Sequence, residues 1–215
     1  MGYTIQDTTL IEKYLQGVKS VLDLGSQSLY IGNEPLPPFV DTWYKSKGVT
    51  EYNCIDLAGD NNAWQLDLSH FLYGNFKFDL VVDCGTKEHV VKMKGYDKVP
   101  FHGGHINSIY PTEVEDIELG YYNAWTNQHN FLKSGGIMIC VNPKTGNWGG
   151  HGYTYLTEKF YKDLAANSDY EILELGEWAA CGNTVDGWNI YCVLRKKSES
   201  FPSFETFKKF DYKPE

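Results

Sequence analysis

The 215-residue sequence contains no apolar run that approaches the ~20 residues needed to cross a lipid bilayer. Its N-terminus, MGYTIQDTT, also lacks the basic start and the apolar core of a secretory signal. Basic residues are scarce, because 19 lysines and arginines face 28 acidic residues and the formal net charge is -9. A broad basic surface for nucleic acid is therefore not expected. These absences predict a cytoplasmic protein with no membrane partner and no nucleic-acid partner.

Cysteine is also sparse and follows neither a disulfide nor a metal-binding pattern. The five cysteines are widely spaced and never form C-x-x-C. Cys54, Cys140 and Cys192 lie inside apolar, strand-like runs, where a reduced thiol behaves as a small hydrophobic side chain. We therefore expect neither a disulfide framework nor a zinc site.

The sequence does contain an alternation of strand and helix patterns. Buried-strand runs are expected at VKSVLDLGS, YNCIDL, FDLVVD and GIMICVNP, with a weaker strand at 63–68. Two last runs, YEILELGEWAA and WNIYCVLRKK, have no helical pattern between them, which suggests an antiparallel close to the sheet. The alternation indicates an α/β domain with a doubly wound, Rossmann-like, mostly parallel sheet and helices on both faces.

Capping boxes mark the expected helix starts. One box pairs Thr9 with Glu12, and a second pairs Thr112 with Glu115 ahead of a helical face that is apolar except for Gln128. Prolines precede a further helical pattern that ends at Gly48, and TEKFYKDLAANS supplies another.

We expect one domain over residues 1–197, because the sequence shows no internal repeat and no linker. Residues 91–111 lack a clear period and are interpreted as an insertion or lid. The tail, 198–215, carries phenylalanine at a three-residue spacing, at Phe201, Phe204, Phe207 and Phe210. A tail packed back on the domain is the favoured interpretation. The alternative is a surface for homo-oligomerisation, since exposed aromatic stripes rarely stay unpaired.

Acidic residues and glycines recur where the predicted strands end. In an open α/β sheet, ligands bind outside the carboxyl ends of the strands. Gly25 permits a turn with close ligand approach, Asp56 could accept both hydroxyls of a ribose, and Asp67 could read an adenine edge. Each acid alone is more often a turn residue or a helix cap. Four successive strand ends with suitable groups favour a nucleotide-type ligand.

Five segments in this order resemble class I S-adenosylmethionine-dependent methyltransferases: VLDLGS, IDL, LDLS, FDLVVDCGTKEHV and FLKSGGIMI. The resemblance covers roughly the first two thirds of the chain. It implies a seven-stranded sheet with an antiparallel last strand and S-adenosylmethionine as cofactor. One departure is Gln27, which stands where the family usually has a second glycine.

The resemblance also implies a set of cofactor contacts. By this likeness, Asp23, Gly25 and Ser26 border the methionine moiety, and Asp56 and Leu57 lie at the ribose. Asp67 and Leu68 read adenine. Asp83, Cys84 and Gly85 lie near the transferred methyl.

His89 is the first candidate for a catalytic base, with Glu88 as its orienting partner or a substrate contact. The alternative, held equally open, is that both residues belong to a first helical turn and cap it. Glycine-rich loops supply candidate acceptor contacts at His102, His105, Trp148, His151, Tyr153 and Tyr155. No metal is expected, because H-G-G-H is not an established ligand spacing.

The resemblance therefore predicts a methyltransferase that methylates a small-molecule acceptor at oxygen or nitrogen. A second hypothesis, motivated by Gln27 and the aromatic tail, is a catalytically inactive, methyltransferase-like partner subunit. A third is an NAD-dependent oxidoreductase, and the missing G-x-G-x-x-G after the first strand counts against it.

Overall fold

The computed structural model describes residues 2–31, 39–57, 60–94, 114–179 and 187–214. Their elements in chain order are β1 (Gly2–Tyr3), α1 (Ile5–Glu12), β2 (Ser20–Leu24), β3 (Ser28–Leu29), α2 (Val40–Ser46), β4 (Glu51–Ile55), η1 (Asp60–Asn62), β5 (Phe78–Cys84), η2 (Lys87–His89), β6 (Lys92–Met93), β7 (Val114–Asp116), α3 (Ile117–Phe131), β8 (Leu132–Pro143), β9 (Thr154–Leu156), α4 (Glu158–Ser168), β10 (Tyr170–Ala179), β11 (Trp188–Lys196), α5 (Phe204–Phe207) and β12 (Tyr212–Pro214).

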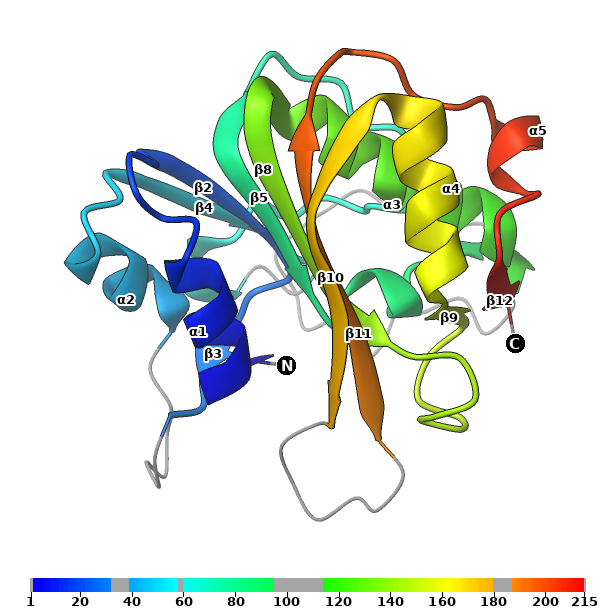
Figure 1. The fold of residues 1–215 in the computed structure, drawn as a ribbon, viewed down its shortest axis with the longest axis horizontal. Helices are drawn as coiled ribbons and strands as arrows, with labels where there is room; N and C mark the ends of the chain where they lie inside the picture. Colours follow the sequence, from blue (N-terminus) through cyan, green and yellow to red (C-terminus); the bar gives the residue numbers. More distant parts are fainter. Residues whose placement is uncertain (1, 32–38, 58–59, 95–113, 180–186, 215) are drawn as a thin grey trace.

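The described residues build a six-stranded main sheet in the order β10-β11-β8-β5-β2-β4 (Figure 1). β4, β2, β5 and β8 are parallel neighbours. β11 runs antiparallel to both β8 and β10. The antiparallel pairing of the two last predicted strands is thus confirmed.

The predicted strand at 63–68 does not form a seventh strand. Its only ladder contact in the described structure is one parallel bridge between Ile55 and Trp64, beside the edge strand β4. The Leu66 N–H then donates back to the Trp64 carbonyl at 2.9 Å, which turns the backbone away from β4. The described residues therefore give six strands in this sheet, rather than the seven that the family resemblance implied.

Helices cover both faces of the sheet, as predicted (Figure 1). α1 and α2 lie on one face, and α3, α4 and α5 on the other. Alternate residues of β8 show the two layers, because Ile137 and Ile139 join the α1/α2 core while Met138 and Cys140 join the α3/α4 core. This period of two is what a strand buried on both sides requires.

α1 begins at Ile5, so the predicted capping box at Thr9 is wrong. Thr4 is the N-cap, and the Asp7 carboxylate accepts a hydrogen bond from the Thr4 amide at 2.7 Å. The Thr9 hydroxyl instead donates to the Ile5 carbonyl at 2.7 Å within the helix. A carboxylate three residues after a threonine makes the same reciprocal cap whether it is Asp or Glu, which made two starts competitive.

α3 also begins later than its predicted capping box. Thr112 lies outside the described residues, and Val114–Asp116 forms β7, which pairs with β6. Asp116 is the N-cap, since its carboxylate accepts from the Leu119 amide at 2.8 Å. α2 and α4 cover the segments predicted for them, and Gly48 follows α2 in a left-handed conformation with φ +88°.

The aromatic tail packs back on the domain, as favoured. Phe207 and Phe210 are buried in the α3/α4 core, and β12 pairs antiparallel with β9. The Tyr122 hydroxyl donates to the Pro202 carbonyl at 3.0 Å and ties the tail to α3. Because Phe207 and Phe210 are buried, they are not part of an exposed aromatic stripe, which was the reason to consider homo-oligomerisation through this tail.

Most of the predicted lid at 91–111 lies outside the described residues, together with His102 and His105. Its first residues, Lys92–Met93, form β6. Within the described part of the chain, no helix has the length and apolar character needed to cross a membrane.

Candidate active site

A cavity of ≈ 370 Å³ opens where β2, β4 and β5 end. This volume falls in the range of small-ligand pockets. The structure brings five of the predicted cofactor residues together in its wall: Gly25, Asp56, Leu57, Asp67 and Leu68. They come from three separate chain segments. Gly25 and Asp56 follow the parallel strands β2 and β4, which end at the same edge, and Asp67 follows the segment that bridges to β4 at Trp64.

The turn after β2 requires glycine at position 25. Gly25 has φ +87°, and a Cβ there would lie 2.4 Å from the Thr86 hydroxyl oxygen. The Thr86 hydroxyl donates to the Leu24 carbonyl at 2.7 Å, and the Gly25 amide donates to the Ile55 carbonyl at 2.7 Å. Three strand ends are thereby locked together under the cavity.

Two carboxylates of the cavity wall are held in defined orientations. Asp56 accepts a hydrogen bond from the Ser26 amide at 2.8 Å. Asp67 accepts from the Ser69 amide at 2.8 Å, and its other oxygen lies 3.1 Å from Nδ1 of His70. Ser26 therefore contributes to the site indirectly, because its backbone amide orients the Asp56 carboxylate.

The cavity also has an apolar wall that the sequence prediction missed. Besides the acids, it is lined by Ile55, Leu66, Thr86, Val90, Val91 and Met93. Two adjacent valines directly after a polar turn were the available signal in the sequence. Adjacent valines are also common in buried strands, so this signal does not distinguish a cavity wall from core.

Asp23 does not line this cavity, and its contact with the cofactor stays a prediction. Its side chain is fully buried and accepts hydrogen bonds from the hydroxyls of Tyr3 at 2.6 Å and Tyr52 at 2.9 Å, with Tyr44 at 3.4 Å. Burial raises the pKa of Asp23 to about 7, although these hydroxyl hydrogen bonds act in the opposite direction.

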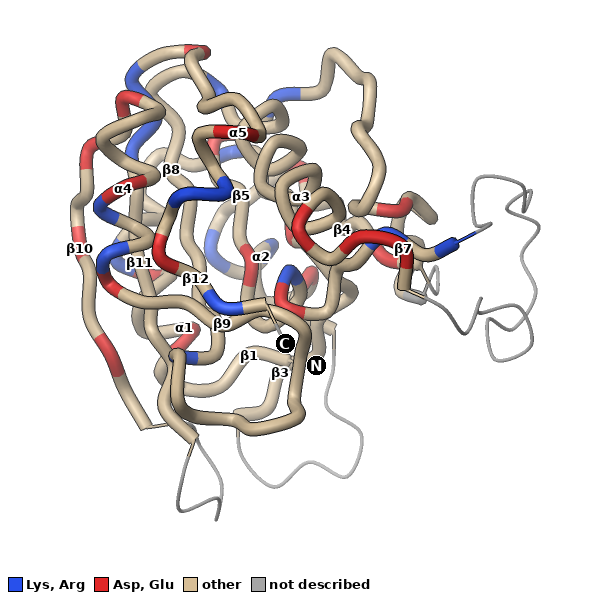
Figure 2. Tube along the Cα trace, turned by 90° about the vertical axis from the view of Figure 1, so that its right-hand side faces the viewer, with Lys and Arg blue, Asp and Glu red and all other residues tan. Residues whose placement is uncertain are grey.

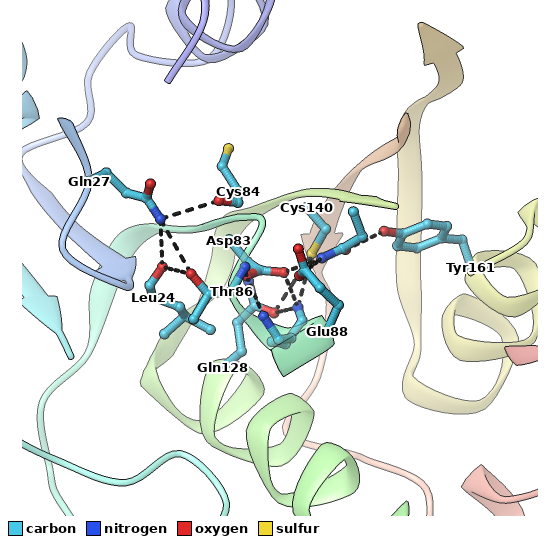
Figure 3. A network of polar contacts seen from close by, with 11 residues as sticks. Leu24, Gln27, Asp83, Cys84, Thr86, Glu88, Gln128, Cys140 and Tyr161 are labelled. Atoms are coloured by element: carbon cyan, nitrogen blue, oxygen red, sulfur yellow. Dashed lines mark hydrogen bonds and ion pairs between the residues drawn. The ribbon is translucent and has the colours of Figure 1, made fainter. Parts of the chain in front are cut away.

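Asp83 is also fully buried and does not line the cavity, so its cofactor role likewise stays a prediction. It forms an ion pair with the buried Lys87 at 3.1 Å and accepts from the Asn142 side chain at 2.8 Å. Lys87 also donates to Gln128, the polar residue on the inner face of α3. Figure 3 shows Asp83 and Gln128 within this network of polar contacts.

Gln27 fills the space between the ends of β2 and β5. Its side-chain amide donates to the carbonyls of Leu24 at 3.3 Å and Cys84 at 3.2 Å (Figure 3). It also lies 3.3 Å from the Thr86 hydroxyl. The residue that replaces the usual second glycine is thus a cross-link within the turn.

A second cavity of ≈ 170 Å³ lies on the β8 side of β5. Cys84 and Gly85 line this second cavity and not the first. Trp148 and His151 lie in its wall, as the prediction for acceptor contacts requires. The N-terminal segment contributes Gly2, Thr4 and Asp7, which the sequence offered no reason to include.

Glu88, His89 and His151 converge at the boundary between the two cavities. His89 lines the first cavity, whereas Glu88 and His151 line the second. Oε1 of Glu88 lies 3.7 Å from Nε2 of His89 and 3.8 Å from Nε2 of His151. Burial, with repulsion from Asp83, raises the pKa of Glu88 to about 8. Burial and then the neighbouring His151 lower the pKa of His89.

η2 is a short 3₁₀ turn, and the backbone amides at its start are hydrogen-bonded by Asp83 and not by Glu88 or His89. The Asp83 carboxylate accepts from the amides of Thr86 and Lys87, both at 3.2 Å. Glu88 and His89 are therefore not needed to satisfy these amides. Their side chains meet His151 instead.

The tyrosines of the β8–β9 loop differ in role. Tyr153 lines the first cavity, and its amide donates to the Glu88 carbonyl at 2.7 Å. Tyr155 is buried and lines neither of the two cavities, so its acceptor contact stays a prediction. Its hydroxyl accepts from the His151 amide at 3.0 Å and donates to the Trp148 carbonyl at 2.9 Å, which fixes the loop.

No protein-family model matches this chain, and no curated protein matches it. Solved structures do resemble it. The Burkholderia thailandensis 1,6-didemethyltoxoflavin-N1-methyltransferase, with bound 1,6-didemethyltoxoflavin and S-adenosylhomocysteine, has a TM-score of 0.57 at 14% identity, over 89% of this chain and 76% of that one.

Two further structures broaden this likeness. The N-methyltransferase NodS from Bradyrhizobium japonicum WM9, in complex with S-adenosylhomocysteine, has a TM-score of 0.53 at 13% identity, over 89% of this chain and 85% of that one. The StiE O-MT has a TM-score of 0.50 at 10% identity, over 94% and 76%. At such identities the likeness establishes the fold alone.

Proposed function

We propose that this chain, which has the class I methyltransferase fold, is an S-adenosylmethionine-dependent methyltransferase that methylates a small molecule at oxygen or nitrogen. The observation that carries this proposal is the cavity in which Gly25, Asp56, Asp67 and Leu68 meet at the strand ends. The neighbours of known structure include two with bound S-adenosylhomocysteine, which supports the same cofactor here.

The residues of the first cavity fit an adenosyl ligand. Asp56, held by the Ser26 amide, would accept the ribose hydroxyls, because a carboxylate can accept two hydrogen bonds. Asp67 and Leu68 would meet the adenine edge, and Val90 and Val91 offer an apolar surface for its ring face. When bound, this cofactor supplies an electrophilic methyl group on a sulfonium.

The second cavity supports a small acceptor. Its volume is ≈ 170 Å³, and the N-terminal segment closes it from one side with Thr4 and Asp7. Methyl transfer is an in-line displacement, so the chain's contribution is to align the acceptor and exclude water. In this proposal His89 receives or positions the acceptor proton, and Glu88 orients the imidazole.

Nucleic acid is a poorer acceptor for this chain. Acidic residues outnumber basic ones, 28 to 19. Figure 2 shows basic and acidic residues interspersed on the described part of the chain, for example along α4. There Lys159 pairs with Asp163 and Lys162 pairs with Glu158, so these charges are locally balanced.

A second candidate function is a methyltransferase-like subunit without catalysis. The specific observation in its favour is Gln27, whose amide cross-links the turn where the family usually keeps a glycine. This candidate predicts weak or absent cofactor binding and a protein partner. An NAD-dependent oxidoreductase stays the third hypothesis, with the missing glycine fingerprint against it.

Thermal unfolding with S-adenosylhomocysteine, S-adenosylmethionine and NAD tests the proposal. A ligand at ~100 times its Kd adds about 2.7 kcal/mol, which means a shift of roughly 5–10 °C for a chain of this size. We expect this shift with both adenosyl-sulfur ligands and none with NAD. Asp56→Ala should abolish it, whereas Asp41→Ala, on the outer face of α2, should keep it.

The outcomes separate the candidates. No shift with either adenosyl-sulfur ligand contradicts the methyltransferase proposal and favours the partner subunit. A shift that survives in Asp56→Ala contradicts the assignment of the first cavity. A shift without conversion of S-adenosylmethionine in the presence of any tested acceptor favours a cofactor-binding subunit without catalysis.

A further inference from the structure

We propose that Glu88, His89 and His151 form a binding site for one divalent transition-metal ion of the zinc type. Their donor atoms all lie within 4.8 Å of one another. Two of these separations, 3.7 and 3.8 Å from Oε1 of Glu88, are too long for hydrogen bonds. They are close to the spacing of two ligands that share one ion.

The required distances are those of ordinary zinc coordination. Ligands at about 2.0–2.1 Å from a tetrahedral ion stand about 3.4 Å apart. The Glu88–His89 and Glu88–His151 pairs therefore need to close by only a few tenths of an ångström. Both imidazoles are more than a third exposed, at 36% and 38%, so their rings have room for this movement.

Glu88 is the strongest independent sign of a ligand. Its side chain is 1% exposed, and Oε1 has no hydrogen-bond partner. A buried, unsatisfied carboxylate oxygen is costly unless a cation or a donor meets it. Oε1 points to where the two imidazole nitrogens converge, and a shared cation would satisfy all three atoms.

Each ligand is held by its own support. The Asp83–Lys87 ion pair and the Asn142 side chain fix η2, and Asn142 lies 3.5 Å from the second Glu88 oxygen. The His151 loop is fastened by the Tyr155 hydroxyl and by the Tyr153 amide. Such second contacts are what hold metal ligands in place.

Gly152 lies tightly against Glu88. A Cβ at this position would lie 2.9 Å from the Glu88 carbonyl oxygen. A larger residue would therefore push His151 away from Glu88. This close packing brings ligands from distant parts of the chain together. The spacing of histidines along the sequence does not show such a contact, so no metal was expected from that spacing.

The donor set indicates which class of ion binds. Two imidazole nitrogens and one carboxylate oxygen suit Zn²⁺ and its transition-metal neighbours better than Mg²⁺ or Ca²⁺, which prefer oxygen. Three protein ligands leave at least one coordination position open, as catalytic sites do. That position lies where the first cavity meets the second.

The role of the ion rests on the proposed function, whereas its binding does not. With the ion bound, His89 is a ligand through Nε2 and no longer the base, so an acceptor hydroxyl at the open position would lose its proton to solvent water, because a bound divalent ion lowers the pKa of an oxygen ligand. The oxygen lone pair would then form the bond to the methyl carbon. The carbon–sulfur bond would break with its electron pair on sulfur, which gives the neutral thioether product.

Calorimetric titration of metal-free, tag-free protein with Zn²⁺ tests the site, with Co²⁺ absorption as a report on the ligand field. We expect one ion per chain. Glu88→Gln, His89→Ala and His151→Ala should each weaken binding at least about tenfold. His70→Ala is the matched control, since this histidine is 33% exposed and lies outside the cluster, and its Zn²⁺ affinity should be unchanged.

Absence of Zn²⁺ binding, or binding that all three substitutions leave unchanged, overturns the metal proposal. Circular dichroism and the melting temperature of each variant exclude loss of fold as the reason for a weakened titration. A thermal shift with S-adenosylhomocysteine in the presence of a chelator separates the two proposals. If it persists without Zn²⁺ binding, the metal site fails while the methyltransferase proposal stands.

Discussion

Asp23 and Asp83 end neighbouring strands with the same D-x-G pattern, yet they lie in opposite layers of the molecule. In the parallel pairing of β2 with β5, Asp23 stands opposite Val82, and Asp83 stands opposite Leu24. This offset of one residue sends the two carboxylates to opposite faces of the sheet. Asp23 enters the α1/α2 layer and Asp83 the α3/α4 layer.

The two layers stabilise a buried carboxylate by different means. Asp23 has only neutral tyrosine hydroxyls around it, so burial raises its pKa to about 7. Asp83 has the ammonium of Lys87 and the Asn142 amide. The comparison shows that one sequence pattern yields a proton-binding group in one layer and an ion pair in the other.

Removing the cation from the Asp83 layer should have the largest effect. Lys87→Met leaves Asp83 as a buried charge without its ion partner, which costs about 3–5 kcal/mol of unfolding free energy. Urea unfolding measures this loss. The double variant Asp83→Asn/Lys87→Met removes both charges and should recover most of it. Equal destabilisation of the single and double variants would contradict the ion-pair explanation.

The second-largest effect is expected in the pH dependence of stability, to which the Asp23 carboxyl contributes. Its pKa is about 7 in the folded state and about 3.9 in an unfolded chain. Between these values the folded state binds more protons, so the free energy of unfolding falls as pH rises from about 4 to 7. Relative to Asp23→Asn, the wild type should lose about 2–4 kcal/mol over this range.

Urea unfolding of both proteins at several pH values between 4 and 8 tests this slope. Asp79 supplies the control. Partial burial raises its pKa, but hydrogen bonds from Lys133 and from the Lys19 and Ser20 amides outweigh it and lower that pKa to about 2. Asp79→Asn should therefore keep the Asp23 slope. A slope that persists in Asp23→Asn would contradict the assignment.

Removing one hydroxyl from the Asp23 layer should have a smaller effect. Tyr52→Phe removes the hydrogen bond that Asp23 accepts at 2.9 Å, and we expect a loss of about 1 kcal/mol. The same change at Tyr73, which is 91% exposed, should leave stability unchanged within measurement error. Chemical denaturation decides the point, and equal effects at both tyrosines would count against a specific role for the hydroxyl.

The smallest expected effect concerns the cofactor. Asp23 is sealed from the first cavity, so Asp23→Asn should change the Kd of S-adenosylhomocysteine by less than about threefold. Asp56→Asn removes a charged acceptor from the cavity wall and should raise that Kd about 10- to 100-fold. Calorimetric titration compares the two. Similar losses in both variants would place Asp23 among the cofactor residues.

Much of the fold could be predicted from local patterns. β5, β8, β10 and β11 follow strand-like runs whose hydrophobic pattern can be read over a few residues. Helix starts were less predictable, because Thr4 with Asp7 and Thr9 with Glu12 offer nearly equivalent capping chemistry. The segment at 63–68 failed as a strand because a backbone turn at Leu66 outcompeted pairing with β4.

The residues of the candidate site also fall into those that could be predicted from the sequence and those that could not. Gly25 and Asp56 could be predicted, since parallel strands end at one edge and carry the residues that follow them to the same place. Asp67 reaches the same cavity from a segment that is not a strand of the main sheet. The meeting of His151 with Glu88 could not, because it depends on a loop fastened by Tyr155 and on the absence of a side chain at Gly152.

The sequence by itself determined the α/β alternation and the row of acidic strand ends, because hydrophobic periodicity and turn chemistry act over a few residues. Only the tertiary structure decided which face each acid of a D-x-G pattern occupies and which side chains surround it. The physical reason is that strand register and loop docking are long-range choices. An offset of one residue between β2 and β5 exchanges the faces, and no local pattern encodes it.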